Sequence, residues 1–443
     1  MINNAAFIHR GATNTNCKFP IDDFREIKYK VLNWADRFGT FCFLDNHFYA
    51  TGPHSVEILL AVDPIESISG DAGNMLAAFQ QKLDAGRHWW FGHLGYDLKN
   101  ETEGLSSSHP DHIGFPDFFF FRPATIIKLT ADCVEIITEG DAGAIFKSIM
   151  ESASEIAEQE PLDQIAIRQR MQRDEYIETV QRLQQHILRG DCYEINFCQE
   201  FYAENVKLSP LRLYIDLSAV SPNPFSAFYR IGQRFLVCAS PERYLKKEGG
   251  IILSQPIKGT SARFQSDHDR DTQSRNELAA SKKDRSENVM VVDLVRNDLS
   301  KICKASTVVV NELFSVYSFP QVHQMISTIS GHLREDVNFK DIIHATFPMG
   351  SMTGAPKRKV MDLIEQYEKT KRGLFSGAVG YISPGFDFDF NVVIRSVLYN
   401  REDGYLAFLA GSGITFYSDA ESEYEECMVK AAAIKKVLLP DPS

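Results

Sequence analysis

Short apolar runs separated by polar and glycine-containing turns fill the first 165 residues, a pattern typical of a sheet-rich region. Apolar residues at helical spacing predict one helix there, at Met75–Leu83. An aromatic strand that turns at glycine is predicted for Trp89–Asp97. The other predicted strands are Phe41–Leu44, Val56–Val62, Phe118–Phe121 and Thr125–Leu129.

After this region the pattern includes longer helices. Asp174–Arg189 carries apolar residues on one face, acids at its start and Gly190 after its end, which predicts a helix. Strands are predicted at Tyr193–Phe197 and Arg234–Ala239, and the two longest helices at Arg275–Leu299 and Ala420–Leu439. Short strands mixed with helices indicate an α+β fold.

The segment Glu139–Asp163 separates the two regions. It is acidic, rich in Ala and Glu, poor in aromatic residues, and contains Pro161. We therefore predict a boundary here, with an N-terminal region of residues 1–165 and a C-terminal region of residues 166–443.

Composition narrows the class of protein. The 443 residues are 44% hydrophobic and 24% charged, and no apolar run approaches the ~20 residues of a membrane span. The first residues lack an apolar secretory segment, which predicts a cytoplasmic protein without membrane contact. A net charge of −12 with no basic stripe argues against nucleic acid, so an anionic substrate would need a local pocket of cations and NH groups.

The eight cysteines show no Cys-x-x-Cys spacing, so a disulfide framework or a zinc site is not expected. Cys192 and Cys198 are predicted to be core residues. None of the eight has the Gly-x-Cys-x-Gly surroundings of a class I glutaminase nucleophile. Any glutamine-derived ammonia would therefore come from a separate subunit.

Lys258 is the first candidate for chemistry. It follows the apolar strand Ile251–Leu253 and lies between Pro256 and Gly259, which end regular pairing and bend the backbone. Poor hydration at this position would favour the neutral amine, which is a nucleophile. On spacing alone, a surface lysine in a turn is the alternative.

Two pairs of acids at i, i+3 spacing form the second candidate. Asp284 and Glu287 share one face of a predicted helix, and Glu423 and Glu426 repeat the arrangement on the last helix, near Lys430. One such pair is ordinarily a solvated helix face. Two pairs at the edges of amphipathic helices provide the few carboxylates that a Mg²⁺ site needs.

The run His344–Lys357 is the third candidate. It is not a nucleotide-binding P-loop, because Lys357 does not directly follow glycine and no Ser or Thr comes after it. Its Gly-Ser-Met-Thr-Gly stretch still offers hydroxyl and NH donors to an anion.

These motifs together resemble those of chorismate-using enzymes. The resemblance rests on Ser240–Arg243 (Ser-Pro-Glu-Arg), Pro256–Thr260 (Pro-Ile-Lys-Gly-Thr) and Gly350–Lys357 (Gly-Ser-Met-Thr-Gly-Ala-Pro-Lys), and it is dense from about residue 174 to 438. The family includes component I of anthranilate synthase and of aminodeoxychorismate synthase, and the isochorismate and salicylate synthases. Lysine at position 258 resembles the aminodeoxychorismate branch, since the anthranilate branch has alanine there.

The resemblance implies two large antiparallel sheets packed face to face with helices outside. It implies Mg²⁺-dependent amination of chorismate to 4-amino-4-deoxychorismate, with ammonia from a glutamine amidotransferase subunit. Lys258 would add at C2, Glu242 would act as acid–base, and His323 would lie near the chemistry, although a buried structural histidine is an equal interpretation. Glu287 and Glu426 would bind the metal directly, with Asp284 and Glu423 beside them. Substrate contacts are implied for Gly259, Thr260, Ser351, Thr353, Tyr381, Arg395, Gly411, Gly413 and Lys430.

One position departs from the family pattern. Glu194 stands where amine-adding members carry glutamine, which leaves its role open, and where water-adding members carry a lysine base. The missing lysine argues against isochorismate or salicylate synthesis. Residues Phe43–Asn46 only loosely resemble the element that binds tryptophan in anthranilate synthases, so regulation by tryptophan does not follow. Anthranilate synthase component I and a non-catalytic chorismate-binding paralogue remain the alternatives.

Overall fold

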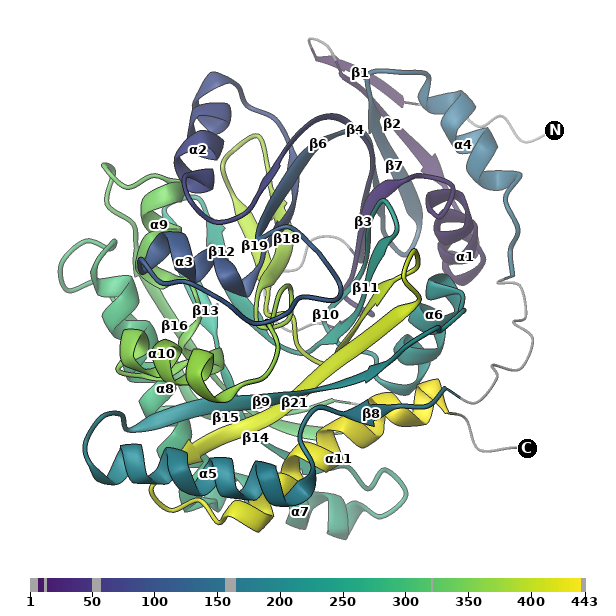
Figure 1. Ribbon diagram of the computed structural model, residues 1–443. Helices are drawn as coiled ribbons and strands as arrows, with labels where there is room; N and C mark the ends of the chain where they lie inside the picture. Colours follow the sequence, from purple (N-terminus) through teal and green to yellow (C-terminus); the bar gives the residue numbers. More distant parts are fainter. Residues whose placement is uncertain (1–6, 12–13, 50–56, 156–164, 320–321, 440–443) are drawn as a thin grey trace.

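The structure is a computed structural model that describes residues 7–11, 14–49, 57–155, 165–319 and 322–439 (Figure 1). Every strand pairing among these residues is antiparallel. Helices lie outside the strands (Figure 1). The predicted α+β class is confirmed.

Two long strands, β4 (Ile58–Gly70) and β6 (Phe118–Leu129), belong to both halves of the strand network. Their register shifts between Pro64 and Glu66, where Pro64 lies opposite Pro123. Proline has no NH to donate to a strand ladder, so the pairing is interrupted there while the chain continues extended. The two strands predicted at Phe118–Phe121 and Thr125–Leu129 are therefore one strand.

The first sheet runs outward from one end of β4 and β6 and carries the residues of β9 and β21 that reach the candidate site. Its remaining strands are β1 (Phe7–Gly11), β2 (Asn14–Pro20), β3 (Thr40–Asp45), β7 (Cys133–Thr138), β8 (Arg168–Gln169), β9 (Glu194–Ala203), β10 (Phe225–Ile231), β11 (Arg234–Ser240), β17 (Gly354–Ala355), β20 (Ser396–Asn400) and β21 (Tyr405–Thr415).

The second sheet begins where the other end of β6 pairs with β5, and it carries Lys258 on β14. Its strands are β5 (Trp90–Leu94), β12 (Arg243–Glu248), β13 (Ile251–Gln255), β14 (Ile257–Ala262), β15 (Val309–Ser318), β16 (Val322–His332), β18 (Ala378–Ile382) and β19 (Phe388–Asn391).

The two sheets share one apolar core. Successive side chains of a strand point to opposite faces, so Phe228 packs under the helices of the first sheet while Tyr229 and Leu236 face the second sheet. There they join Phe91 and Phe390 in one buried cluster. This arrangement agrees with the predicted face-to-face packing of two sheets.

The helices cover both outer faces. Helices α1, α4, α5, α6 and α11 contribute to the core of the first sheet, and α2, α8 and α9 to the core shared with the second. Their bounds are α1 (Phe24–Ala35), α2 (Met75–Ala85), α3 (Lys99–Thr102), α4 (Ala142–Met150), α5 (Arg173–Leu188), α6 (Pro210–Val220), α7 (His268–Ala280), α8 (Lys282–Ser300), α9 (Phe339–Thr346), α10 (Lys357–Tyr367) and α11 (Ala420–Leu438), with 3₁₀ turns at Tyr96–Leu98 and Gly350–Met352.

The prediction of one long helix at Arg275–Leu299 is wrong at Ser281. Ser281 ends α7 and adopts an extended backbone conformation, and its hydroxyl accepts a hydrogen bond from the NH of Asp284. This is the geometry of a helix N-cap, which starts α8 in a new direction. The break sets the position of Asp284 and Glu287 at the start of α8.

Strands from residues 1–165 and 166–443 pair directly, as β3 does with β10 and β5 with β18. The proposed boundary falls next to residues 156–164, outside the described part of the chain, and stays a prediction. All eight cysteines are free thiols, and no helix among the described residues is long and apolar enough to cross a membrane.

Candidate active site

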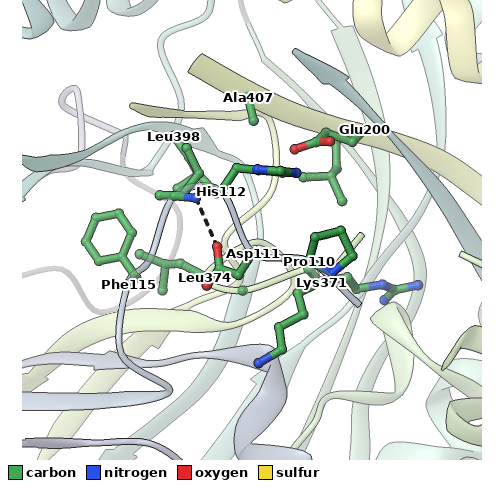
Figure 2. Close-up of a pocket in the computed structure, with 13 residues that line it drawn as sticks. Pro110, Asp111, His112, Phe115, Glu200, Lys371, Leu374, Leu398 and Ala407 are labelled. Carbon is green, nitrogen blue, oxygen red and sulfur yellow. Dashed lines mark hydrogen bonds between the residues drawn. The ribbon is translucent and has the colours of Figure 1, made fainter. Parts of the chain in front are cut away.

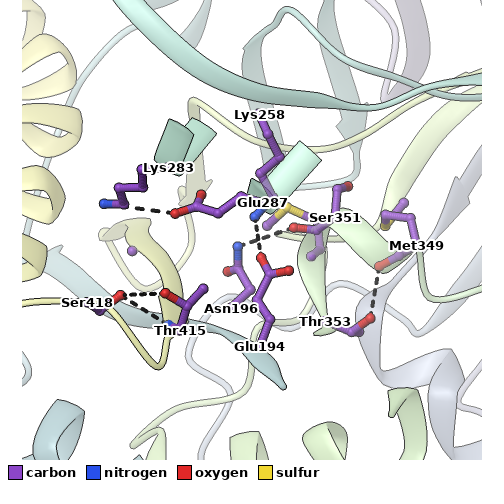
Figure 3. A network of polar contacts seen from close by, with 12 residues as sticks. Glu194, Asn196, Lys258, Lys283, Glu287, Met349, Ser351, Thr353, Thr415 and Ser418 are labelled. Carbon is purple, nitrogen blue, oxygen red and sulfur yellow. Dashed lines mark hydrogen bonds and ion pairs between the residues drawn. The ribbon is translucent and has the colours of Figure 1, made fainter. Parts of the chain in front are cut away.

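An ion pair joins the two sheets at the candidate site. The Lys258 ammonium on β14 lies 2.8 Å from Oε1 of Glu194, the first residue of β9 (Figure 3). The Lys258 side chain is 10% exposed and that of Glu194 is 2% exposed. Lys258 is therefore not a surface lysine in a turn.

The protonation of Lys258 differs from the prediction. Burial alone would lower its pKa, but the neighbouring carboxylates of Glu194 and Glu287 outweigh burial and hold the pKa above its ordinary value. The expectation of a neutral amine is thus wrong for the protein without substrate, in which Lys258 is an ammonium. A nucleophilic Lys258 must first lose a proton.

Two glycines make room for this pair. At Gly413 on β21, a Cβ atom would lie 2.8 Å from Glu194 Oε1 and 3.0 Å from Lys258 Nζ. Gly259 has φ +93°, and a Cβ there would lie 3.0 Å from Asp284. Both glycines let charged side chains approach the backbone closely.

Glu242 is the second buried acid of the site. Burial raises its pKa to about 7, although a hydrogen bond from Ser351 and the charges of Lys258 and Arg395 lower it. Glu242 is only 4% exposed. A carboxyl group with this pKa can both donate and accept a proton near neutral pH.

Arg395 provides a partly buried cation beside Glu242. Burial lowers the pKa of its guanidinium, and the charge of Glu242 partly restores it. The residue adopts φ +50°, a conformation that non-glycine residues rarely take. Its guanidinium has no hydrogen-bond partner within the described residues, so it is available to bind a carboxylate through two parallel bonds.

The loop that contains Ser351 and Thr353 is braced against β9. Asn196 donates from its side chain to the Ser351 carbonyl at 3.2 Å and from its backbone to the Thr353 carbonyl at 2.7 Å. The Thr353 hydroxyl donates to the Met349 carbonyl within the loop (Figure 3). Lys357 donates to Asp298 of α8 at 2.6 Å. Ser351 therefore faces Glu242, while Lys357 fixes the loop.

Three acids of α8 and α11 converge on one cation, Lys283. Its Nζ lies 3.2 Å from Glu423 Oε1, 3.7 Å from Glu426 Oε2 and 3.9 Å from Glu287 Oε1. Lys430 lies 2.8 Å from Glu426 and donates to the Gly411 carbonyl at 2.9 Å. Three of the four predicted metal ligands are thus brought together.

The fourth predicted ligand lies elsewhere. Asp284 lies against Gly259, where a Cβ atom would be 3.0 Å from its side chain, and within the described residues it forms no ion pair with Lys283. Glu287 Oε1 and Glu423 Oε2 are buried without a hydrogen-bond partner. Among the described residues, no three His, Cys, Asp or Glu side chains already surround a metal position. The donor set and its buried free oxygens suit Mg²⁺, but the acids are gathered around an ammonium.

These acids titrate differently because their surroundings differ. Burial raises the pKa of Glu287 to about 7, with Lys258 and Lys283 opposing the rise. Burial also raises the pKa of Glu426, but Lys430 and Lys283 reverse this and leave it below its ordinary value.

Three predicted residues lie apart from the ion pair. His323 is buried, with Nδ1 2.8 Å from the Ser318 hydroxyl and Nε2 3.2 Å from Asp271, which agrees with the structural interpretation. Thr260 is exposed on β14. Gly411 needs no side chain because a Cβ there would lie 1.9 Å from the Phe197 carbonyl of the paired strand. In the described structure Gly411 thus allows close strand packing, and its carbonyl accepts the hydrogen bond from Lys430.

Tyr381 lines a different cavity. That cavity also contains Asp45, Asn46, Trp89 and Ser226, and Tyr381 packs on the rings of Trp89 and Phe91. The structure therefore does not place Tyr381 with Lys258. Tyr381 lies on β18 opposite Phe91 of the neighbouring strand β5, so their side chains lie on the same face of the second sheet.

A further small cavity lies beside Arg372, lined by the loop Pro110–Phe115 and by Glu200, Lys371 and Leu398 (Figure 2). None of the predicted site residues lines it. Arg372 itself donates at 2.7 Å to the carbonyls of both Asn196 and Met352 and pairs with Glu368 at 2.6 Å. Sequence reasoning missed this brace, because a Glu and an Arg four residues apart ordinarily indicate an exposed helix pair.

The structure brings together a nearly buried lysine, a buried acid with a pKa near neutrality, an arginine without an ion pair among the described residues, and a carboxylate cluster. These are the groups that a site for a small anionic substrate requires. The chain belongs to the chorismate binding enzyme family, which matches residues 45–436. The resemblance to chorismate-using enzymes is confirmed.

Several individual proteins of this family are similar to the chain over most of its length. The chain is 35% identical to aminodeoxychorismate synthase component 1 of Escherichia coli K12 over 350 residues, 78% of this chain and 76% of the relative. It is 34% identical to the Klebsiella aerogenes protein of that name over 345 residues, 77% of this chain and 75% of the relative. Anthranilate synthase component I of Streptococcus pneumoniae TIGR4 shares the fold, with a TM-score of 0.75 and 25% identity over 88% of this chain and 95% of that one.

Proposed function

We propose that this protein is the chorismate-aminating component of an aminodeoxychorismate synthase. It replaces the C4 hydroxyl of chorismate with an amino group and releases 4-amino-4-deoxychorismate and water. The observation that carries this proposal is the buried Lys258 beside Glu194 and Glu242, since the anthranilate branch has no amine at this position. Relatives at 35% identity that carry this name support it.

The first step requires an unprotonated Lys258. The nearest proton acceptor is Glu194 Oε1, 2.8 Å away, and transfer along this bond gives a neutral amine and a neutral acid. The amine adds to C2, the ring double bond shifts, and the C4–O bond breaks. Glu242 in its acid form donates the proton with which the hydroxyl leaves as water.

The second step breaks the bond between C2 and Lys258 and introduces the amino group. Ammonia forms a bond to C4, the double bond shifts back, and the bond between C2 and Lys258 breaks. The proton released from the new ammonium group goes to the Glu242 carboxylate, which restores the acid. Arg395 binds a substrate carboxylate throughout, because its guanidinium lies beside Glu242 and has no hydrogen-bond partner among the described residues.

Glu287, Glu423 and Glu426 would hold Mg²⁺. When bound there, the metal supplies positive charge against the ring carboxylate of chorismate. The residues fit this role because two of their oxygens are buried and lack partners.

Ammonia reaches this chain from a glutamine amidotransferase partner. Seven of the eight cysteines are buried, and burial raises the pKa of the partly exposed Cys133 thiol. A glutaminase nucleophile instead has a lowered thiol pKa. The chain alone can use ammonia but cannot release it from glutamine.

The test is an assay of the purified chain with chorismate and Mg²⁺, supplied with either ammonium chloride or glutamine. We expect 4-amino-4-deoxychorismate, identified by mass and absorbance, with ammonium and no product with glutamine. Anthranilate as the product would identify the alternative synthase, and no turnover would identify a non-catalytic paralogue. Glutamine-dependent turnover by the chain alone would disprove the need for a partner.

A further inference from the structure

Lys283 lies at the point where the carboxylates of α8 and α11 meet. Its ammonium is within 4 Å of Glu287, Glu423 and Glu426, which come from two different helices. A dashed line in Figure 3 marks the ion pair between Lys283 and Glu287. Among the described residues, these acids form no ready-made metal site, although they are the acids that would bind Mg²⁺.

The position of Lys283 on its helix is unfavourable without these acids. It is the second residue of α8, where the partial positive charge of the helix N-terminus disfavours a cation. The nearby carboxylates offset this repulsion. Lys283 in turn reduces the mutual repulsion of three acids, one of which, Glu423, is only 1% exposed at its side chain.

The lysine is also able to leave. Its side chain is 51% exposed, so four carbon–carbon torsions can carry the ammonium into solvent without backbone change. Mg²⁺ and an ammonium cannot share one set of carboxylates within 4 Å at low cost, because like charges repel. One cation must exclude the other.

We propose that Lys283 is an internal counter-ion that occupies the position of Mg²⁺ and is displaced when the metal binds. This inference rests on the magnesium site of the proposed function. Lys283 holds the acids together in the metal-free protein and, by competition, sets the affinity for Mg²⁺ lower than the carboxylates alone would give.

The test measures binding of MgCl₂ to the full chain by isothermal titration calorimetry, without chorismate. Lys283→Met keeps the aliphatic length and removes the charge, and we expect it to bind Mg²⁺ at least ~10-fold more tightly. Its melting temperature in EDTA should fall below the wild-type value and rise above it in MgCl₂. Lys283→Arg retains a cation, so its affinity should stay near that of wild type.

Lys282→Met is the matched control. Lys282 precedes Lys283 on the same helix, is exposed, and makes no ion pair with any residue that the structure describes. Its Mg²⁺ affinity and its metal-dependent melting shift should equal those of the wild type. If Lys282→Met raised the Mg²⁺ affinity as much as Lys283→Met does, the cause would be the net charge of the protein and not the position of Lys283.

The outcomes separate this inference from the proposed function. Equal or weaker binding by Lys283→Met, with wild type binding normally, overturns the counter-ion role and makes Lys283 an organiser of the acids. Binding by Lys283→Met when wild type shows none supports the inference in its strongest form. Absence of binding in both proteins overturns this inference and the proposed metal site together.

Discussion

The Lys258–Glu194 ion pair and the cluster of Lys283 with Glu287, Glu423 and Glu426 both hold opposite charges close together, but they differ in burial and in geometry. Lys258 and Glu194 are both nearly buried, joined at 2.8 Å, and enclosed by strands from two sheets. Lys283 is half exposed, and its three acids lie at longer distances on two helices. In the proposed mechanism the first arrangement fixes the reacting amine, whereas the proposed role of the second requires that one cation can replace another.

The largest effect is expected from removing the fixed amine. Lys258→Arg keeps a cation but cannot supply a neutral nucleophile, because arginine stays protonated. We expect amination of chorismate to fall at least ~1,000-fold, with the fold intact by circular dichroism. Chorismate without ammonia should leave on wild type an adduct equal in mass to chorismate less one water, on the peptide that contains Pro256–Thr260.

Lys258→Ala tests the same residue in another way. It reproduces the alanine of the anthranilate branch, so 4-amino-4-deoxychorismate formation should collapse and some 2-amino product should appear. Substantial activity of Lys258→Arg with no trappable adduct would reduce Lys258 to an orienting charge. The choice between the two synthase branches would then be open again.

Substitutions in the Lys283 cluster should give the next largest loss of turnover. Glu287→Gln or Glu426→Gln removes one ligand charge while keeping size, and we expect turnover of chorismate to fall ~100-fold. Glu425→Gln is the control, because Glu425 lies on α11 but is exposed and outside the cluster. Near-normal turnover of both cluster variants at limiting Mg²⁺ would show that these acids form only a solvated face.

The sequence predicted the helices and strands that carry these two charged groups better than it predicted the protonation of their side chains. The periodicity of Asp174–Arg189 and Ala420–Leu439 predicted α5 and α11 within one residue at each end, because buried residues recur at helical spacing along both helices. The break at Ser281 was missed, since the helical pattern continues on both sides and only the capping geometry reveals it.

The candidate site shows the same limit. Local motifs identified Lys258 and Glu242, but the protonation of Lys258 depends on Glu194, 64 residues earlier in the chain. Lys283 escaped notice because a lysine beside acids on a helix is ordinary in sequence. The misplacement of Tyr381 arose because a strand presents neighbouring residues to opposite faces, which a motif alone does not record.

A smaller effect should appear in stability rather than turnover. Burial raises the pKa of Glu242 from 4.5 to about 7, so the folded protein holds this proton more tightly than the unfolded chain does. The contribution of the protonated acid to stability is complete below pH 4.5 and is lost as the pH rises through about 7.

Glu242→Gln imitates the protonated acid at every pH. At pH 8 we expect it to raise the free energy of unfolding by roughly 3 kcal/mol, with little change near pH 4.5 and with loss of amination. Urea denaturation at both pH values is the measurement. An equal effect at the two pH values would show that titration of Glu242 is not its cause.

The smallest expected effect is a shift in the pKa of Lys258 when its partner Glu194 is replaced. Glu194 and Glu287 hold the pKa of Lys258 above its ordinary value against burial, which acts in the opposite direction. In Glu194→Gln the nearest charge is lost while burial remains, so the pKa of Lys258 should fall by at least ~1 unit, a tenfold change in its neutral fraction. Modification of Lys258 by an amine-specific reagent, followed by peptide mass spectrometry across pH 7–11, measures this shift.

Glu200→Gln is the matched control for this experiment. Glu200 lies on the same strand, is buried, and pairs with Arg170 at 2.6 Å, so its loss disturbs β9 to a similar degree without touching Lys258. If both variants shift the pKa of Lys258 equally, the cause is distortion of β9. If only Glu194→Gln lowers it and amination still falls, then Glu194 does more than hold Lys258 protonated. Most Lys258 side chains still carry a proton after a tenfold change in the neutral fraction, so the fall in amination is then assigned to loss of the proton acceptor at 2.8 Å.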